Sequence, residues 1–131
     1  MVDDIERAVG TYIKSHYTSA VEIGFGGKTI AAEILQDAGI PVLCTDIHAY
    51  KGAVPSVIDD CVNPDLSHYQ FADVIYAIRP GVELVSNMIK LAEILNVDLI
   101  VYHLGFELYL GGGEVIETGG IQLHRYVRKK V

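Results

Sequence analysis

The sequence contains few cysteines and few cations. Two of its 131 residues are cysteine, Cys44 and Cys61, and their separation of 17 positions fits neither a zinc nor a redox motif. Ten lysine and arginine residues stand against 17 aspartate and glutamate residues, which gives a net charge of −7. This balance argues against a nucleic-acid partner, because such proteins neutralise phosphates with clustered cations. The one basic cluster, RYVRKK at residues 125–130, is expected to be a solvated tail.

Long apolar runs are also missing. No uncharged stretch exceeds eight residues, whereas a membrane-spanning helix needs roughly 20 mostly apolar residues. The first ten residues, MVDDIERAVG, are acidic and lack the apolar centre of a signal peptide. We therefore expect a cytoplasmic protein without a membrane segment. Half of the residues are hydrophobic, so we expect a single domain over residues 1–131 with one core.

What the sequence does contain is an alternation of helical and strand-like segments. Apolar residues at helical spacing predict three helices, at residues 3–17, 28–38 and 82–95. Short apolar runs predict strands at residues 20–24, 41–46, 56–59, 72–78 and 98–103, followed by a hairpin that turns at 118–120. Because strands alternate with helices, we expect parallel pairing with helices on both faces. The predicted fold is α/β: a three-layer, doubly wound, mostly parallel sheet with a C-terminal hairpin at one edge.

One segment, VEIGFGGKTIAAEILQDAGIPVLCTDIH at residues 21–48, indicates a ligand site. Gly24 and Gly26 follow a strand, and glycine allows both a sharp turn and the close approach of a ligand. The next helix begins near Lys28, and a helix N-terminus presents free N–H groups. Asp46 ends the following strand, where an acid typically accepts hydrogen bonds from ribose hydroxyls. The alternative is that the glycines only permit a tight turn.

The residues around this turn narrow the choice of ligand. A Walker loop needs glycine where Glu22 stands, and a dinucleotide fingerprint needs glycine where Thr29 stands. Glu22 is an acid in an apolar strand, and a buried carboxylate is costly without a partner. With Asp46, Asp59 and Asp60 at the strand ends, it predicts an acidic mouth. Such a mouth suits a cationic ligand, and S-adenosylmethionine carries both an ammonium and a sulfonium group.

The same segment resembles motifs I and II of class I S-adenosylmethionine-dependent methyltransferases. VIDDCV occupies the place of motif III and FADVIYAIRP the place of motif IV, so this resemblance covers about residues 20–105. The whole chain also resembles a small family of archaeal proteins with a methyltransferase-like, Rossmann-like fold, through its DD…NP and YAIRP…EL stretches.

This resemblance implies a role for each residue of the first two strand ends. Glu22 would face the methionine ammonium of S-adenosylmethionine, directly or through water. Gly24 and Gly26 would pass beneath the ligand. Asp46 would bind the ribose hydroxyls, and Ile47 would lie against the adenine.

It implies further roles at the next two strand ends. Either Asp60 or Asp59 would reach the adenine amino group. Ala77, Ile78 and Arg79 would line the end of the site that holds the methyl donor.

Two polar residues are candidates for chemistry on a second substrate. Arg79 follows a strand end and precedes a proline, so it could bind a carboxylate or phosphate. It could equally form an ion pair with Asp73, Glu83 or an acid of the mouth. His103 is either a general base or a hydrogen-bonded core histidine. No metal site is expected.

Two classes of function remain open at this point. The first is a small S-adenosylmethionine-binding protein, which would be a methyltransferase if an acceptor also binds. The second is a non-catalytic nucleotide- or dinucleotide-binding regulatory module, favoured by Lys28 and the small size. A third reading, a fold without a ligand, follows from Lys28 in place of the third motif I glycine. Replacing Glu22 by Gln should weaken a cationic ligand and spare an anionic one, which separates the first two. The acceptor and the oligomeric state are not predicted.

Overall fold

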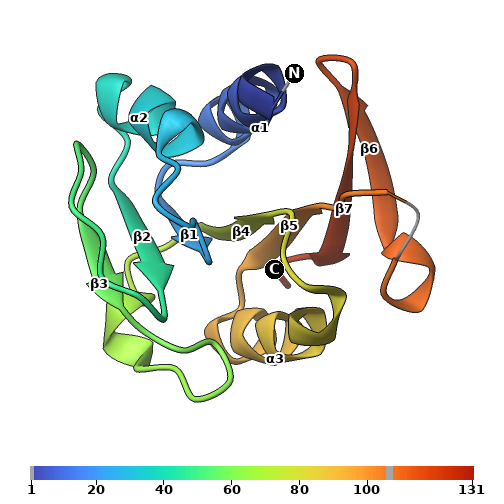
Figure 1. Ribbon diagram of the computed structural model, residues 1–131. Helices are drawn as coiled ribbons and strands as arrows, with labels where there is room; N and C mark the ends of the chain where they lie inside the picture. Colours follow the sequence, from blue (N-terminus) through green and yellow to red (C-terminus); the bar gives the residue numbers. More distant parts are fainter. Residues whose placement is uncertain (1, 106–107) are drawn as a thin grey trace.

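The computed structural model describes residues 2–105 and 108–131, and within them seven strands form one sheet (Figure 1). The strands are β1 (Ala20–Ile23), β2 (Val42–Asp46), β3 (Ser56–Ile58), β4 (Val74–Ile78), β5 (Asp98–Tyr102), β6 (Glu114–Thr118) and β7 (Ile121–Val127). Their order is β3-β2-β1-β4-β5-β7-β6. The first five pair in parallel, while β7 is antiparallel to both β5 and β6. The expected mostly parallel sheet with a C-terminal hairpin at one edge is confirmed.

Helices cover both faces of this sheet. α1 (Val2–His16) and α2 (Ile30–Asp37) lie on one face, and α3 (Val85–Leu95) lies on the other (Figure 1). The described residues also form three short 3-10 turns: η1 (Leu66–His68), η2 (Val82–Leu84) and η3 (Leu110–Gly112). Among the described helices, none has the length and apolar character that crossing a membrane requires.

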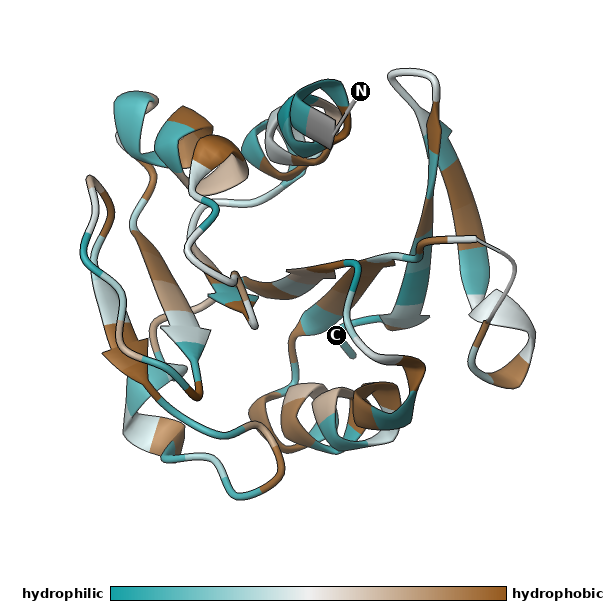
Figure 2. Cartoon of the chain, in the orientation of Figure 1, coloured by the Kyte–Doolittle hydropathy of each residue, from teal (hydrophilic) through white to brown (hydrophobic). Residues whose placement is uncertain are grey.

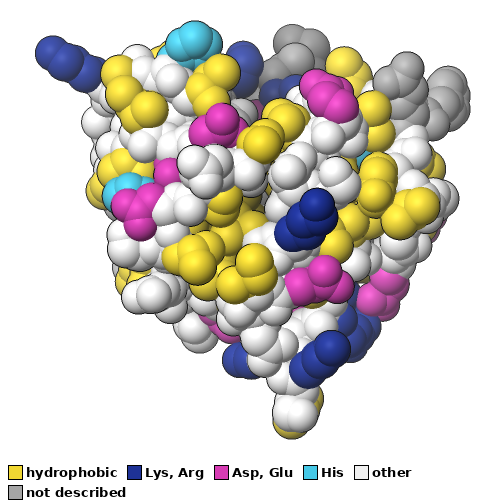
Figure 3. Space-filling model, turned by 90° about the horizontal axis from the view of Figure 1, so that it is seen from below, with side chains coloured by type: hydrophobic (Ala, Val, Ile, Leu, Met, Phe, Trp, Pro, Cys, Tyr) yellow, Lys and Arg dark blue, Asp and Glu magenta, His cyan; other side chains and the backbone are white. Residues whose placement is uncertain are grey.

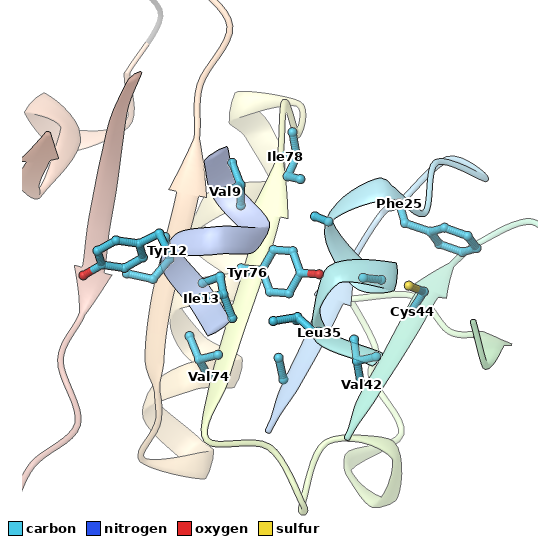
Figure 4. Close-up of a cluster of buried hydrophobic side chains, with 14 of the residues drawn as sticks. Val9, Tyr12, Ile13, Phe25, Leu35, Val42, Cys44, Val74, Tyr76 and Ile78 are labelled. Atoms are coloured by element: carbon cyan, nitrogen blue, oxygen red, sulfur yellow. The ribbon is translucent and has the colours of Figure 1, made fainter. Parts of the chain in front are cut away.

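Two apolar clusters hold the layers together, one on each side of the sheet. The central strands are apolar along most of their length (Figure 2). On the first face, apolar side chains of α1 and α2 pack on β1, β2 and β4 (Figure 4). The labelled members are Val9, Tyr12, Ile13, Phe25, Leu35, Val42, Cys44, Val74, Tyr76 and Ile78. On the second face Met88, Leu91 and Ala92 of α3 pack on alternate residues of the same strands. Seen from the α3 side, further hydrophobic side chains lie at the surface among charged ones (Figure 3).

One helix differs from expectation in where it begins. α2 begins at Ile30 rather than Lys28, because the Lys28 N–H closes a turn on the Phe25 carbonyl at 3.0 Å. As expected from the predicted elements, the connections from β2 to β3 and from β3 to β4 contain no α-helix, only η1. Ile58 at the end of β3 is therefore 61% exposed.

The basic C-terminal cluster is only partly a solvated tail. Arg125 belongs to β7, its side chain is 15% exposed, and it pairs with Glu114 at 2.9 Å and with Asp98 at 3.5 Å. The expectation is wrong for this residue because β7 continues to Val127. The basic residues after Val127 are exposed.

Candidate functional site

A cavity of about 530 Å³ opens at the carboxyl ends of the parallel strands. This volume lies within the range of small-molecule sites. Its walls come from the segments that follow four strands and from the start of α3. They include Ile23, Gly24, Asp46, Ile47, His48, Tyr50, Asp59, Asp60, Cys61, Val62, Arg79, Pro80, Gly81, Leu84 and Met88.

The glycine turn after β1 forms one wall. Gly24 and Gly26 have φ of 67° and 62°, a left-handed conformation that favours glycine. A Cβ built on either residue would meet no atom within 4 Å, so the space next to both is open. Gly27 is different, because a Cβ there would lie 2.8 Å from the ring of Tyr50. The turn thus combines tight packing at Gly27 with open space at the two glycines predicted to lie beneath a ligand.

Asp46 stands opposite this turn with a fixed carboxylate. Its Oδ2 accepts a hydrogen bond from the Gly26 N–H at 2.9 Å, and its Oδ1 accepts one from the His48 N–H at 3.0 Å. A carboxylate oxygen can accept two hydrogen bonds, so each oxygen retains capacity for a ligand hydroxyl. The neighbouring Ile47 is 63% exposed and lines the same cavity. A polar acceptor and an apolar surface therefore lie side by side.

The two acids after β3 have different surroundings. Asp59 accepts hydrogen bonds from the hydroxyl of the buried Tyr69 at 2.5 Å and from the Asp65 N–H at 3.0 Å, so both its oxygens hold the loop. Asp60 accepts one from the Val62 N–H at 2.9 Å through Oδ1. Its Oδ2 accepts none within the described chain, and the residue is exposed. Asp60 is the freer of the two carboxylates.

Glu22 is buried and is not among the residues that line the cavity. Its side chain is buried on the α1 side of the sheet, near Tyr76. The pKa of Glu22 is raised to about 8, mainly by burial and also by the Glu6 charge, while the nearby Tyr76 hydroxyl and Arg79 oppose the shift. The Glu22 Oε1 and Tyr76 Oη atoms each lack a hydrogen-bond partner of good geometry among the described residues.

Arg79 pairs with an acid that the sequence reading missed. Its Nη2 donates to Oε2 of Glu6 in α1 at 2.8 Å, and Glu6 is 2% exposed. The expected partners Asp73, Glu83 or an acid of the mouth are therefore wrong. The available signal was helical spacing, because Glu6 precedes Val9 by three positions on the buried face of α1.

The backbone at Arg79 is also unusual. Its φ is 55°, a left-handed conformation that is rare for a long side chain, and its N–H donates to the Tyr102 carbonyl at 2.7 Å. This conformation ends β4 and turns the chain toward Pro80.

The structure does not bring Ala77 or His103 into the cavity. Ala77 is buried under α3, and Ile78 packs in the cluster on the opposite face. His103 is 7% exposed, and its Nε2 lies 2.6 Å from the Tyr126 hydroxyl. Burial lowers the pKa of His103, and the neighbouring His124 lowers it further. These contacts match the hydrogen-bonded core histidine of the two alternatives.

In residues 2–105 and 108–131, no group of three or more histidine, cysteine, aspartate or glutamate side chains is placed to hold a metal ion.

The sheet order defines the class of fold. The protein has a Rossmann-like α/β fold with a mostly parallel sheet. Within that class the chain belongs to the uncharacterised protein family UPF0146, whose profile matches residues 5–118.

Relatives from archaea support this assignment. A UPF0146 protein of Pyrococcus horikoshii is 33% identical over 112 residues, which cover 81% of this chain and 86% of the relative. A UPF0146 protein of Archaeoglobus fulgidus is 32% identical over 97 residues, which cover 71% of this chain and 74% of the relative.

Solved structures show the same fold in methyltransferases. An S-adenosylmethionine-dependent methyltransferase from Archaeoglobus fulgidus aligns with a TM-score of 0.52 at 13% identity, over 72% of this chain and 51% of its own. The 1,6-didemethyltoxoflavin N1-methyltransferase of Burkholderia thailandensis, solved with bound S-adenosylhomocysteine, aligns with a TM-score of 0.56 at 14% identity. That match covers 95% of this chain and 61% of the enzyme. The protein therefore spans only about half to three-fifths of these two methyltransferases.

Proposed function

We propose that the cavity binds S-adenosylmethionine or its product S-adenosylhomocysteine. The observation that carries the proposal is the Asp46 carboxylate, which two backbone N–H groups fix in the cavity wall opposite an open glycine turn. A fixed acceptor at the end of β2 suits the two hydroxyls of a ribose. In this arrangement Gly24 and Gly26 pass beneath the ligand.

The other strand ends hold the rest of the ligand. The exposed side chain of Ile47 covers one face of the adenine, and burying this side chain contributes to affinity. Asp60 accepts from the adenine amino group, since Asp59 is already engaged by Tyr69. Glu22 attracts the ammonium group from beneath, through water.

Methyl transfer is compatible with this site. The sulfonium of S-adenosylmethionine is already activated, so alignment of an acceptor can supply most of the rate, and a general base is not required. The acceptor would enter beside Arg79, at the end of the cavity formed by Pro80 and Leu84.

A second candidate is a regulatory module that binds a nucleotide or dinucleotide in this cavity without catalysis. It is favoured by the small size of the chain, which spans about half to three-fifths of the methyltransferases that it resembles. In those enzymes the additional length is available for acceptor binding. A regulatory module would need only the cofactor site.

A ¹⁵N–¹H NMR titration tests both candidates. S-adenosylhomocysteine, S-adenosylmethionine, NAD and ADP are added in parallel to the purified protein. Saturable shifts of the Gly24, Gly26, Asp46 and Asp60 amides with the two sulfur ligands support the proposal. Shifts with NAD or ADP alone support a nucleotide-binding module instead. Silence with all four ligands contradicts both.

A further inference from the structure

The two edges of the sheet differ in how they are protected. An edge strand presents unpaired N–H and C=O groups, and proteins usually protect such an edge with a short strand, proline, lysine or a bulge. β3 is protected in this way, because it has three residues and Pro55 precedes it. β6, the last strand at the other edge, has five residues, contains neither proline nor lysine, and pairs with β7 in unbroken register (Figure 1). Within the described chain, the edge of β6 is therefore available to a further strand.

The backbone groups on the free edge of β6 belong to Val115 and Glu117. Thr118 pairs with Ile121 across a two-residue turn, and residues that flank such a turn exchange backbone hydrogen bonds. The alternation of an antiparallel ladder then directs the N–H and C=O groups of Ile116 toward β7 and those of Val115 and Glu117 away from it. No other described segment forms a backbone hydrogen bond with these outward groups.

The side chains of β6 favour a second copy of the same strand as its partner. If two β6 strands pair antiparallel about Ile116, the Ile116 residues of both copies lie opposite each other. Val115 then lies opposite Glu117, and Glu114 lies opposite Thr118. All five residues of the strand are paired, and no two like charges lie directly opposite, an arrangement that would be destabilising.

The neighbouring registers are less favourable. A pairing centred on Glu117 would place the two Glu117 carboxylates directly opposite each other. A pairing centred on Val115 would leave out Thr118 and would bring in Gly113. The backbone of Gly113 has φ of 61° and ψ of −143°, which is not the extended conformation of a strand. The strand therefore selects the pairing centred on Ile116.

The charge of Glu114 at this edge is compensated within each copy. The chain has a net charge of −7, so two copies repel each other in general. Glu114, however, accepts hydrogen bonds from Arg125 at 2.9 Å and from Arg128 at 3.0 Å. Glu117 lies opposite an apolar residue in the pairing centred on Ile116. Two copies can therefore approach through β6 without setting like charges directly opposite each other.

Apolar side chains also gather near this edge. Val115 is 49% exposed, and Leu108 and Leu110, which precede β6, are 39% and 80% exposed. In the pairing centred on Ile116, the two Ile116 side chains form a central cross-strand pair, and such β-branched pairs stabilise a sheet. Association through β6 thus adds side-chain contacts to the backbone hydrogen bonds.

We propose that β6 pairs antiparallel with β6 of a second copy of this chain, centred on Ile116, so that one continuous sheet runs through both copies. No residue of β6 lines the proposed ligand cavity, so this inference does not rest on the proposed function.

Analytical ultracentrifugation of the purified chain tests the association. We expect a species of twice the 14.3 kDa of the chain that dissociates on dilution. Because pairing of two edge strands is a small interface, we expect a dissociation constant of roughly 10 micromolar.

Charge changes at Val115 test which surface is used. Val115→Glu sets like charges opposite Glu117 at two symmetric positions, so the dimer should become roughly 10- to 100-fold weaker. Val115→Lys sets opposite charges there and should dimerise at least as tightly as wild type. A loss that is confined to Val115→Glu is therefore not a folding defect. Ile94→Glu, a change of a 67% exposed side chain on α3, is the matched control and should leave the dimer intact.

A disulfide tests the register. In Ile116→Cys the two introduced thiols would belong to a non-hydrogen-bonded pair, whose Cα atoms are about 4.5 Å apart, a separation that a disulfide can span. We expect a covalent dimer after mild oxidation, detected on a non-reducing gel. Val115→Cys and Glu117→Cys are the controls and should not form one, because neither residue lies opposite its own copy. The native Cys44 and Cys61 are buried and should not react.

Three outcomes would overturn the inference. The first is a wild-type protein that stays monomeric up to roughly 1 millimolar, a hundred times the expected dissociation constant. The second is a dimer that Val115→Glu leaves unchanged, because the copies would then associate through another surface. The third is a covalent dimer in Val115→Cys or Glu117→Cys but not in Ile116→Cys, because the strands would then pair in another register.

Discussion

Glu22 is a carboxyl group whose ionisation the fold opposes. The groups that face it are Glu6 from α1, Cys44 from β2, and Tyr76 and Arg79 from β4 and its end. The ordinary pKa is 4.5, while burial raises the pKa of Glu22 in the folded protein to about 8. Between these values the folded state binds a proton that the unfolded state has lost. The free energy of unfolding therefore falls as the pH rises through this window.

Glu22→Gln should remove this part of the pH dependence. The difference in unfolding free energy between variant and wild type should grow in favour of the variant by up to about 1.4 kcal/mol per pH unit between pH 5 and 8. Urea denaturation at several pH values measures it. Glu6, whose pKa is also raised by burial, keeps part of the slope in both proteins. If the free energy of unfolding changed with pH in the same way in wild type and variant, the prediction would be contradicted. Glu93→Gln, on the exposed side of α3, is the control.

The adjacent acids Asp59 and Asp60 should give opposite results. Asp59→Asn weakens the contacts with the Tyr69 hydroxyl and the Asp65 N–H, so we expect a loss of roughly 1–3 kcal/mol of stability. Asp60→Asn should leave stability within about 0.5 kcal/mol and weaken binding of S-adenosylhomocysteine roughly 10-fold. Thermal unfolding and calorimetry on both variants measure the two effects. Equal effects of the two changes on affinity would show that Asp60 has no special role.

Single residues differ in how far the sequence alone could assign them. Gly24 and Asp46 were predictable because a turn after one strand and an acid after the next are local patterns whose positions the parallel sheet brings together. The pairing of Arg79 with Glu6 was not, because it joins residues 73 positions apart and depends on where α1 crosses the sheet. The left-handed backbone conformation of Arg79 could not be predicted from the residue type, because arginine rarely adopts it.

At the scale of elements, the spacing of hydrophobic residues predicted the helices and strands. It revealed less about the segments that connect them. The hairpin was predictable because Gly119 and Gly120 separate two alternating strands, and both adopt positive φ. The late start of α2 depends on a hydrogen bond within the glycine turn, which spacing does not reveal. The absence of α-helices in the described connections on either side of β3 leaves that strand short and its end exposed.

The glycine turn after β1 can be tested with a matched pair of glycines. Gly24 and Gly39 have φ of 67° and 78°, and a Cβ on either would meet no atom within 4 Å. Gly39 ends α2, away from the cavity. Alanine at either position should cost roughly 1–2 kcal/mol of stability, because both require a left-handed residue.

Only Gly24→Ala should also impair binding. Its methyl group would occupy the space that the ligand crosses, so we expect at least a roughly 10-fold loss of affinity for S-adenosylhomocysteine, whereas Gly39→Ala should bind as wild type does. Calorimetry at a temperature where both variants are folded measures this. Unchanged affinity in Gly24→Ala would mean that the turn serves the fold alone.

At the scale of the whole molecule, Asp98 joins three distant segments. It begins β5 and accepts hydrogen bonds from the Tyr17 hydroxyl after α1 at 2.5 Å and from the Lys129 N–H at 2.6 Å. Arg125 of the hairpin lies 3.5 Å away. Since β7 also pairs directly with β5, the hairpin is connected to the parallel part of the sheet by both backbone and side chains.

This connection predicts that the chain unfolds as one unit. Differential scanning calorimetry should show a single transition whose calorimetric and van't Hoff enthalpies agree, at about 90 kcal/mol near 60 °C for a domain of this size. Asp98→Asn should lower the free energy of unfolding by roughly 1–3 kcal/mol and the melting temperature by about 3–10 °C, still in one transition. A first transition in which only the hairpin melts would show that β6 and β7 form a separate unit. Asp98 lies at the start of β5, whereas the proposed ligand site lies at the carboxyl ends of the parallel strands. The folded Asp98→Asn variant should therefore bind S-adenosylhomocysteine as wild type does. This result would separate the stability of the sheet from the function of its carboxyl edge.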